Sequence, residues 1–199
     1  TIYLSDKDIH DAVRSGDITL TPYDPKQLQP ATYDIRLGNT FIINDAHSTK
    51  AIDPVKGIFP KTHTVEVKDG DEFVLHPGVS ILGYSKEKFG SDVYLIEVNG
   101  KSSLARIGLI VHNSASIVNP GHYLNIALEL CNLNNVPIVL RPGMQITQLS
   151  FAQLSSHTKR SYEQTGRYHK NNIVGYMPPK GAEPSKKPTR KITSTKKKI

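Results

Sequence analysis

Three polar side chains stand out in an otherwise apolar part of the sequence, residues 99–132. Ser102 and Arg106 are four residues apart in "GKSSLAR", so a helical turn would place both on one face. Glu129 lies in "LNIALELCN", where strand alternation puts it among small neighbours on the face opposite the leucines. A carboxylate in a pocket can move protons, and Arg106 is its natural counter-ion. These residues favour general acid–base chemistry; the alternative is that Glu129 is an ordinary solvent-exposed strand residue.

The same segment has features of a phosphate-binding turn. Gly100 allows a ligand to approach the backbone closely, and the amides of Lys101, Ser102 and Ser103 would open a short helix. The charge of Lys101 would add to the attraction for an anion. Phosphate is the natural ligand of such a turn, although a serine pair after glycine more commonly serves only as a helix cap.

The elements that must position these residues are mostly strands. A short helix comes first, because Ser5 precedes a helical apolar stripe that stops at Gly16. Short alternating stretches with Pro-Gly or Asn-rich breaks follow, and they predict a sandwich, jelly roll or small barrel. The expected strands lie within residues 32–43, 71–85, 91–100, 107–113, 124–132, 136–143 and 144–154. Residues 155–178 show no clear periodicity, yet they contain several aromatic and basic side chains.

The length of 199 residues suits one domain, and its formal charge of +7 is concentrated at one end. Residues 180–199 contain eight lysines and arginines and a single acid, so the rest of the chain is electrically balanced. We expect a β domain at residues 1–178 and a basic, disordered tail at residues 179–199. The tail is either a passive extension or a weak tether to nucleic acid.

Cys131 is the single cysteine, which excludes an internal disulfide and a cysteine-rich zinc site. The eight histidines are scattered without metal-ligand spacing, and His112 is better explained by packing or a subunit contact. The sequence has no apolar run of membrane-spanning length and no signal-peptide pattern. The expected location is therefore the cytoplasm, away from any membrane.

Longer motifs carry a family resemblance. The stretch "GKSSLARIGLIVHNSASIVNPG", followed by "IALEL" and "PIVLRPGMQITQLSF", resembles the dCTP deaminase branch of the dCTP deaminase/dUTPase superfamily. The upstream "LQPATYDIRLG" and "EFVLHPG" and the later "GRY" are similar to that family too, so the resemblance spans residues 3–172. It implies a distorted jelly-roll or β-barrel subunit of the dUTPase-like type. It also implies a homotrimer whose active sites are shared between neighbouring subunits.

The resemblance implies a reaction, the zinc-free hydrolytic deamination of dCTP to dUTP and ammonia. Glu129 would be the general acid/base that activates water for attack at C4 of cytosine. The hydroxyl of Ser102 and the main-chain carbonyl of Ala115 would hold that water, and Arg106 would orient the glutamate.

Nucleotide contacts are implied in the same way. Lys101, Ser103, Tyr162 and Arg167 fall where the family contacts the triphosphate, with magnesium bound chiefly by the phosphates. Asn119 falls where the family contacts the sugar. The segment that closes over the nucleotide adds two more contact residues, Tyr168 and Asn171. Some relatives are inhibited by dTTP, which makes dTTP a further expected ligand.

Three positions depart from the family pattern. Asn119 replaces an aspartate that aligns the hydrolytic water in dUTPases, and an amide can bind a sugar hydroxyl but cannot act as a base. Ser116 replaces a residue that is often glycine, and Leu124 puts bulk where a glycine would let backbone pass closely. Asn119 counts against a dUTPase, and the three changes together leave an altered substrate open, such as a cytosine modified at C5 or a different phosphate level.

Three alternatives to a plain dCTP deaminase follow. One is a bifunctional dCTP deaminase/dUTP pyrophosphatase, and another is a deaminase of a modified cytosine nucleotide. The third is a non-catalytic nucleotide-binding regulator that uses its basic tail on nucleic acid. The intact set of Ser102, Arg106, Ala115 and Glu129 favours an enzyme.

Overall fold

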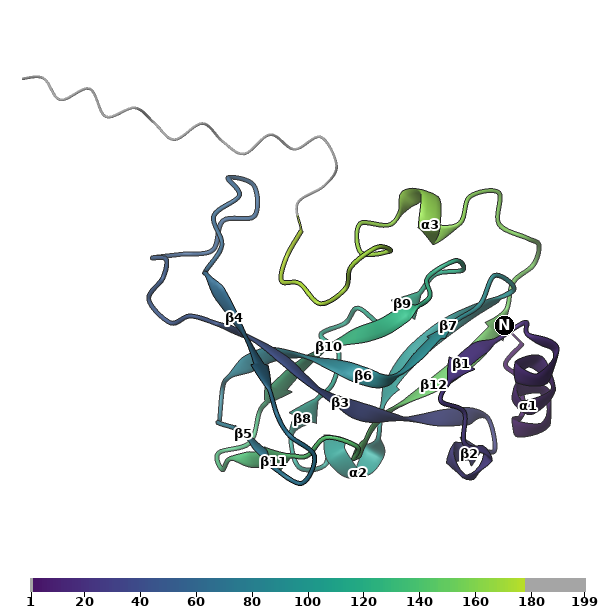
Figure 1. The fold of residues 1–199 in the computed structure, drawn as a ribbon, viewed down its shortest axis with the longest axis horizontal. Coiled ribbons are helices and arrows are strands. Elements are labelled where there is room, and N and C mark those ends of the chain that lie inside the picture. The colour runs from purple at the N-terminus through teal and green to yellow at the C-terminus, as the bar shows by residue number, and fades with distance from the viewer. Residues whose placement is uncertain (1, 178–199) are drawn as a thin grey trace, which may run out of the picture.

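The computed structural model describes residues 2–177, which form a strongly curled antiparallel sheet with short helices at its margins (Figure 1). The sheet contains β1 (Thr19–Thr21), β2 (Leu28–Gln29), β3 (Thr32–Asn44), β4 (Thr62–Glu66), β6 (Ser80–Gly90), β7 (Tyr94–Gly100), β8 (Leu109–Ile110), β9 (Ile117–Val118), β10 (Leu124–Asn132) and β12 (Gln145–Gln153). Its main path runs β8-β10-β6-β3-β12-β7-β9, with β1 paired to β6 and both β2 and β4 paired to β3. A second, two-stranded sheet pairs β5 (Phe73–Leu75) with β11 (Ile138–Leu140).

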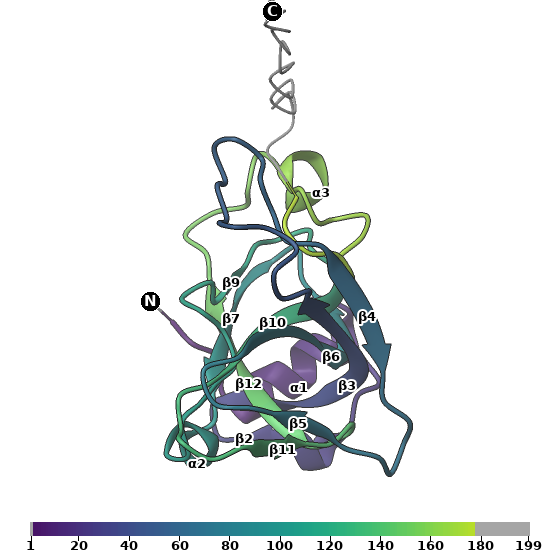
Figure 2. The ribbon, with the colours of Figure 1, turned by 90° about the vertical axis from the view of Figure 1, so that its left-hand side faces the viewer.

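The helices are α1 (Asp6–Ser15), α2 (Ser102–Ala105) and α3 (Tyr162–Thr165), with a 3₁₀ turn, η1 (Pro25–Gln27). Seen at right angles to the first view, the strands wrap around the interior, with α3 at one end and α2 at the other (Figure 2). This placement matters for function, because the segments around α2 and α3 both contain candidate site residues.

Helix α1 begins and ends as the sequence predicts. The hydroxyl of Ser5 accepts a hydrogen bond from the backbone N–H of Asp8 at 3.3 Å. Gly16 ends the helix with a φ of 89°, a left-handed conformation that glycine adopts without strain. Ile9 and Ala12 are buried, so the capped helix is fixed by its apolar stripe against the core.

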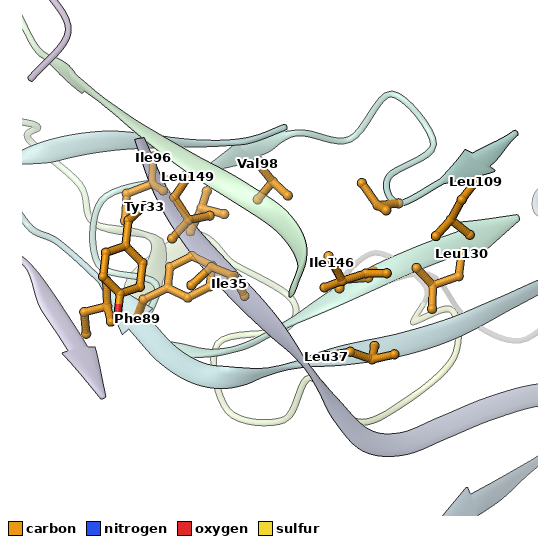
Figure 3. Packing of buried hydrophobic residues seen from close by; sticks show 14 of the residues in the cluster. Tyr33, Ile35, Leu37, Phe89, Ile96, Val98, Leu109, Leu130, Ile146 and Leu149 are labelled. Atoms are coloured by element: carbon orange, nitrogen blue, oxygen red, sulfur yellow. The ribbon is translucent and has the colours of Figure 1, made fainter. Parts of the chain in front are cut away.

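Alternating strand residues form a continuous apolar core (Figure 3). Its labelled members come from six strands: Tyr33, Ile35, Leu37, Phe89, Ile96, Val98, Leu109, Leu130, Ile146 and Leu149. In β10, Leu128 and Leu130 are fully buried, whereas Glu129 between them is only half-buried. The leucine face of β10 therefore packs on the core and turns Glu129 to the opposite side, as the alternation predicts.

Strand β3 changes partner halfway along its length. Its first half pairs with β12 up to Arg36, and its second half pairs with β6 from Leu37 onward. The register on β6 shifts between Leu37 and Phe41, which marks a local irregularity of the β3–β6 ladder. A Cβ added to Gly38 would come 3.0 Å from the carbonyl oxygen of Tyr84, so the backbones approach too closely here for an unstrained side chain.

The fully buried carboxylate of Glu87 supplies acceptors at this change of partner. It accepts the backbone N–H of Arg36 at 2.9 Å and the Arg36 Nε at 2.6 Å. Gln27 of η1 donates to Glu87 at 3.5 Å and accepts from Gln145 of β12 at 3.1 Å. A buried charge is tolerated where its neighbours donate to it, and these donors join η1, β3 and β12 to β6.

The predicted fold class is confirmed. Each of the seven predicted stretches contains a strand, and "GKSSLAR" contains the short helix α2. The strands β1, β2, β4 and β9 were not predicted. They are only two to five residues long, and β4 is exposed along most of its length and pairs with β3. The predicted tail at 179–199 lies outside the described residues. Among those residues, no helix is long and apolar enough to cross a membrane.

Replacing Glu87 by alanine should destabilise the fold, because it removes the acceptor of two Arg36 donors at the β3 crossing. We expect the free energy of unfolding to fall by about 3 kcal/mol, measured by urea denaturation. Glu66→Ala is the matched control, since the Glu66 carboxylate accepts from Thr40 on the exposed surface and its loss should cost under about 0.5 kcal/mol. Equal effects of the two substitutions would contradict the structural role of Glu87.

Candidate active site

A cavity of 410 Å³ lies between the end of the sheet near α3 and the C-terminal part of the described chain. Its volume falls within the range of small-molecule sites. It is lined by Leu82, Val98, His112, Ala115, Ile117, His122, Ile126, Ala127, Glu129, Tyr162, Tyr168, Asn172, Val174, Gly175 and Tyr176. Four residues predicted for the site, Ala115, Glu129, Tyr162 and Tyr168, are therefore brought together.

Strand pairing and one backbone hydrogen bond fix the position of Glu129. Its strand pairs with β6 so that Glu129 stands opposite Leu82. The backbone N–H of Asn113 donates to its Oε2 at 3.2 Å. Asn113 belongs to the same loop as Ala115, so this hydrogen bond draws the Ala115 segment toward the carboxylate. The predicted pair of Glu129 and the Ala115 backbone thus lies within one chain.

A β-bulge shapes the floor of the cavity. The β10–β6 register shifts between Asn125 and Ala127, and the Asn125 side chain donates to the carbonyls of Ser85 and Lys86 at 2.9 and 3.0 Å. Simple alternation would place Ile126 on the core face, away from Ala127. Both Ile126 and Ala127 nevertheless line the cavity, and Ile126 also packs against the core. The sequence pattern alone did not reveal this departure.

The C-terminal segment, residues 162–177, forms the roof of the cavity. The N–H of Tyr162 donates to the Pro120 carbonyl at 2.8 Å, and the side chain of buried Asn172 donates to the Asn125 carbonyl. The hydroxyl of Tyr84 also donates to the Val174 carbonyl, at 3.4 Å. Burial raises the pKa of Tyr84 to about 12, so it remains a neutral donor. The roof is thus fixed to the Pro120 turn and to strands β6 and β10.

His122 is the most deeply buried polar residue of the cavity wall. It is 6% exposed and stacks on Tyr162 with ring centroids 4.4 Å apart. Its Nε2 has no hydrogen-bond partner within the described chain, nor has the Nδ1 of His112. Burial, and secondarily the proximity of His169, lowers the pKa of His122 to about 4. Its imidazole is therefore neutral at physiological pH and offers the cavity an unpaired ring nitrogen.

Ser102 and Arg106 do not line this cavity. Both are exposed, Ser102 at the start of α2 and Arg106 directly after its last residue, at the other end of the curled sheet (Figure 2). None of the ion pairs between residues 2 and 177 includes Arg106. The expectation that Ser102, Arg106 and Glu129 converge is therefore not met within a single chain.

The predicted phosphate-binding turn also lies apart from the cavity. Ser102 and Ser103 line a separate open depression with Lys101. The ammonium group of Lys101 forms a salt bridge of 2.5 Å with buried Asp34. Lys101 is thus committed to an internal carboxylate in the isolated chain, which sequence inspection did not anticipate.

Three other predicted contact residues lie near the cavity without lining it. Asn119 is exposed, and its carbonyl accepts the N–H of His122 at 3.2 Å. Arg167 donates to the Met177 carbonyl at 3.1 Å, and the Asn171 side chain accepts the N–H of Ile173 at 3.0 Å. Arg167 and Asn171 therefore form hydrogen bonds within the roof, and Asn119 forms one within the Pro120 turn.

The two departures expected to reshape the pocket also lie outside its wall. Ser116 accepts the N–H of Val98 through its carbonyl, and Leu124 stands opposite Phe89. The close backbone approach expected at Leu124 occurs instead at Gly90, where an added Cβ would come 2.3 Å from the His122 carbonyl oxygen.

The polar residues of the cavity wall that the sequence did not predict are His112, His122, Asn172 and Tyr176. The histidines lack metal-ligand spacing, and Asn172 is adjacent to the predicted Asn171. The available signal was the position of His122 directly after "NPG", in a segment already assigned to the pocket.

Together, the curled sheet and the roofed cavity with its carboxylate define a β-barrel-like protein with a cavity of the size of small-molecule sites. The sequence model of a family described as dCTP deaminase-like matches residues 3–154. The chain belongs to this family.

Relatives with similar sequence identity to this chain share one printed name. The protein named "dCTP deaminase, dUMP-forming" of Corynebacterium efficiens is 41% identical over 160 residues, which cover 80% of this chain and 83% of the relative. The protein of the same name from Tropheryma whipplei strain Twist is 44% identical over 160 residues, covering 80% and 82%. The crystal structure of 2'-deoxycytidine 5'-triphosphate deaminase from Agrobacterium tumefaciens matches with a TM-score of 0.58 and 23% identity. That match covers 75% of this chain and 47% of the other, and it supports the fold.

The neutral state of buried His122 should make the fold sensitive to acid. In the unfolded chain His122 takes up a proton near pH 6.5, whereas in the folded chain it resists protonation until about pH 4, so falling pH favours unfolding over this range. His122→Phe keeps a ring against Tyr162 but has no group to protonate. The fall in the free energy of unfolding from about pH 7 to about pH 5 should therefore be smaller in this variant by about 1–2 kcal/mol. Thermal unfolding at both pH values measures the effect. His157→Phe, at an exposed position, is the control, and an identical pH response of both variants would contradict the assignment.

Proposed function

We propose that this protein deaminates dCTP and that its nucleotide product is dUMP. The observation that carries the proposal is the cavity in which Glu129 and Ala115 meet under an aromatic roof. The printed names of the relatives add the substrate and the product.

In the proposed reaction Glu129 takes a proton from water, which attacks C4 of cytosine, and passes protons to N3 and to the departing amine. The hydrogen bond from the Asn113 N–H supports this role, because it fixes the carboxylate beside the Ala115 backbone. The Ala115 carbonyl is proposed to hold the attacking water. The neutral ring of His122 and the ring of Tyr162 would then lie against the bound nucleotide.

The proposed product, dUMP, differs from the dUTP that the sequence motifs alone suggest. The relatives are named dUMP-forming, which favours the bifunctional alternative: ammonia leaves cytosine, and a second hydrolysis releases pyrophosphate. Asn119 weighs against the second step, because an amide cannot accept a proton from water as a carboxylate does. Ammonia and pyrophosphate therefore have to be measured separately.

We also propose that a neighbouring copy completes each site, within a homotrimer. Ser102 and Arg106 are exposed and remote from Glu129 within one chain, so a second chain must bring them if they act on the same water. Lys101 and Ser103, on the same turn, would then approach the triphosphate from that neighbour.

Magnesium is part of the proposal as a companion of the triphosphate. Among residues 2–177, no three His, Cys, Asp or Glu side chains are grouped so as to hold a metal ion. The phosphate oxygens would supply most of the ligands, which is usual for magnesium. The ion would neutralise phosphate charge, while Glu129 performs the proton transfers at the base.

The purified protein should release both ammonia and pyrophosphate from dCTP with magnesium, and dUMP should accumulate. Glu129→Gln keeps the shape but removes the base, so ammonia release should fall by about 10²–10⁴-fold with nucleotide binding retained. Ammonia and pyrophosphate are followed in parallel, with dUTP as a second substrate. Ammonia without pyrophosphate would leave dUTP as the product, and full activity of Glu129→Gln would refute the mechanism.

Mixing two inactive variants tests the shared site. Glu129→Gln and Arg106→Ala damage different parts of the proposed site, so random assembly of equal amounts should regenerate about a quarter of the sites intact. Co-refolding the two variants and measuring ammonia release gives the answer. If each site lies within one chain, the mixture will show no more activity than its components do separately.

A further inference from the structure

A second cavity adjoins the first. It has a volume of 420 Å³ and shares three wall residues with the first cavity, Leu82, Gly175 and Tyr176. The proposed function accounts for the first cavity only. The second lies between the strands β3 and β6 and the β3–β4 connection, residues 45–61.

Strand register connects this second cavity to the catalytic carboxylate. Glu129 of β10 stands opposite Leu82 of β6, and Leu82 stands opposite Ile42 of β3. Directly opposed residues of antiparallel strands point to the same face of a sheet, and neighbouring strands are about 4.8 Å apart. Glu129, Leu82 and Ile42 therefore form one row across three strands. Glu129 lines the first cavity, Ile42 lines the second, and Leu82 between them lines both.

The walls of the second cavity are apolar and uncharged. Ile42, Ile52 and Phe59 are typical, and Phe59 stacks on Tyr176 of the roof with ring centroids 4.3 Å apart. The polar wall residues, among them Ser80 and Thr62, are neutral. Such walls suit a small apolar or neutral substituent, and none of the lining residues offers a charged partner to a phosphate.

We propose that the second cavity receives the substituent at C5 of a 5-substituted cytosine nucleotide, so that the protein accepts such nucleotides beside dCTP. The inference rests on the proposed function, in which Glu129 acts at C4. C5 is bonded to C4, so a group on C5 leaves the ring beside the reacting carbon and next to Leu82. Water adds at C4 and the amine leaves as ammonia, while the C5 substituent is neither gained nor lost.

The first test compares kcat/KM for dCTP, 5-methyl-dCTP and 5-propynyl-dCTP in the wild-type protein. We expect the two 5-substituted nucleotides to react within about threefold of dCTP, since a closed pocket would reject even one added carbon by about 10–200-fold. Loss of activity on both analogues, with dCTP turned over normally, overturns the proposal.

The second test fills the cavity. Ser80 lies on the same face of β6 as Leu82 and lines only the second cavity, so Ser80→Leu adds bulk there without touching the first. This variant should lower kcat/KM for 5-propynyl-dCTP by about tenfold or more and leave dCTP within about twofold. Ser155→Leu, the same change at an exposed position that lines neither cavity, should alter neither substrate. Equal effects of Ser80→Leu on both nucleotides would overturn the inference.

Binding separates a failure of this inference from a failure of the proposed function. Titration calorimetry gives Kd for dCTP and 5-propynyl-dCTP without requiring turnover. If neither nucleotide is deaminated but both bind, and Ser80→Leu weakens only 5-propynyl-dCTP, the subsite stands and the proposed reaction is wrong. If dCTP binds and the propynyl analogue does not, the subsite is wrong whatever the reaction.

Discussion

The change of partner in β3 is the constraint on which the rest of the architecture depends. One strand must finish a ladder with β12 and begin another with β6, and the backbone N–H of Arg36 at that point is taken by the carboxylate of Glu87. An unpaired donor here would cost free energy comparable to that of a lost hydrogen bond. Because the N–H of Arg36 has this acceptor, β3 can pair with β12 in one half of the curled sheet and with β6 in the other. The row of side chains from β10 through β6 to β3 then has a fixed register.

The isolated chain contains only part of the expected catalytic set. Glu129, the Ala115 segment and the aromatic roof belong together, while Ser102 and Arg106 lie on α2, away from the cavity. If the proposed roles hold, a lone chain would contain the base without the residues expected to orient it, and activity would depend on assembly. Lys101, on the turn expected to meet phosphate, is paired with Asp34 within the chain.

Much of the fold could be predicted from the sequence, because local rules determine it. The cap at Ser5, the glycine stop at Gly16 and the alternation in β10 each act over a few residues, and all three appear as expected. The site was only partly predictable. The side-chain pattern identified Glu129 as a candidate, but Ile126 also lines the cavity, beside an irregular register between β10 and β6 that apolar periodicity does not predict. Likewise, the burial of His122 depends on Tyr162, forty residues further along the chain.

The β3–β4 connection has a consequence for how such a protein can diversify. Residues 45–61 form part of the wall of the second cavity, but they lie outside the strands that hold Glu129 in register. Insertions and deletions are tolerated better in surface connections than in paired strands. If the second cavity receives part of the base as proposed, a change in the length of this loop would alter which bases fit without altering the strand that contains Glu129. Substrate range and proton transfer would then be encoded in different stretches of the gene.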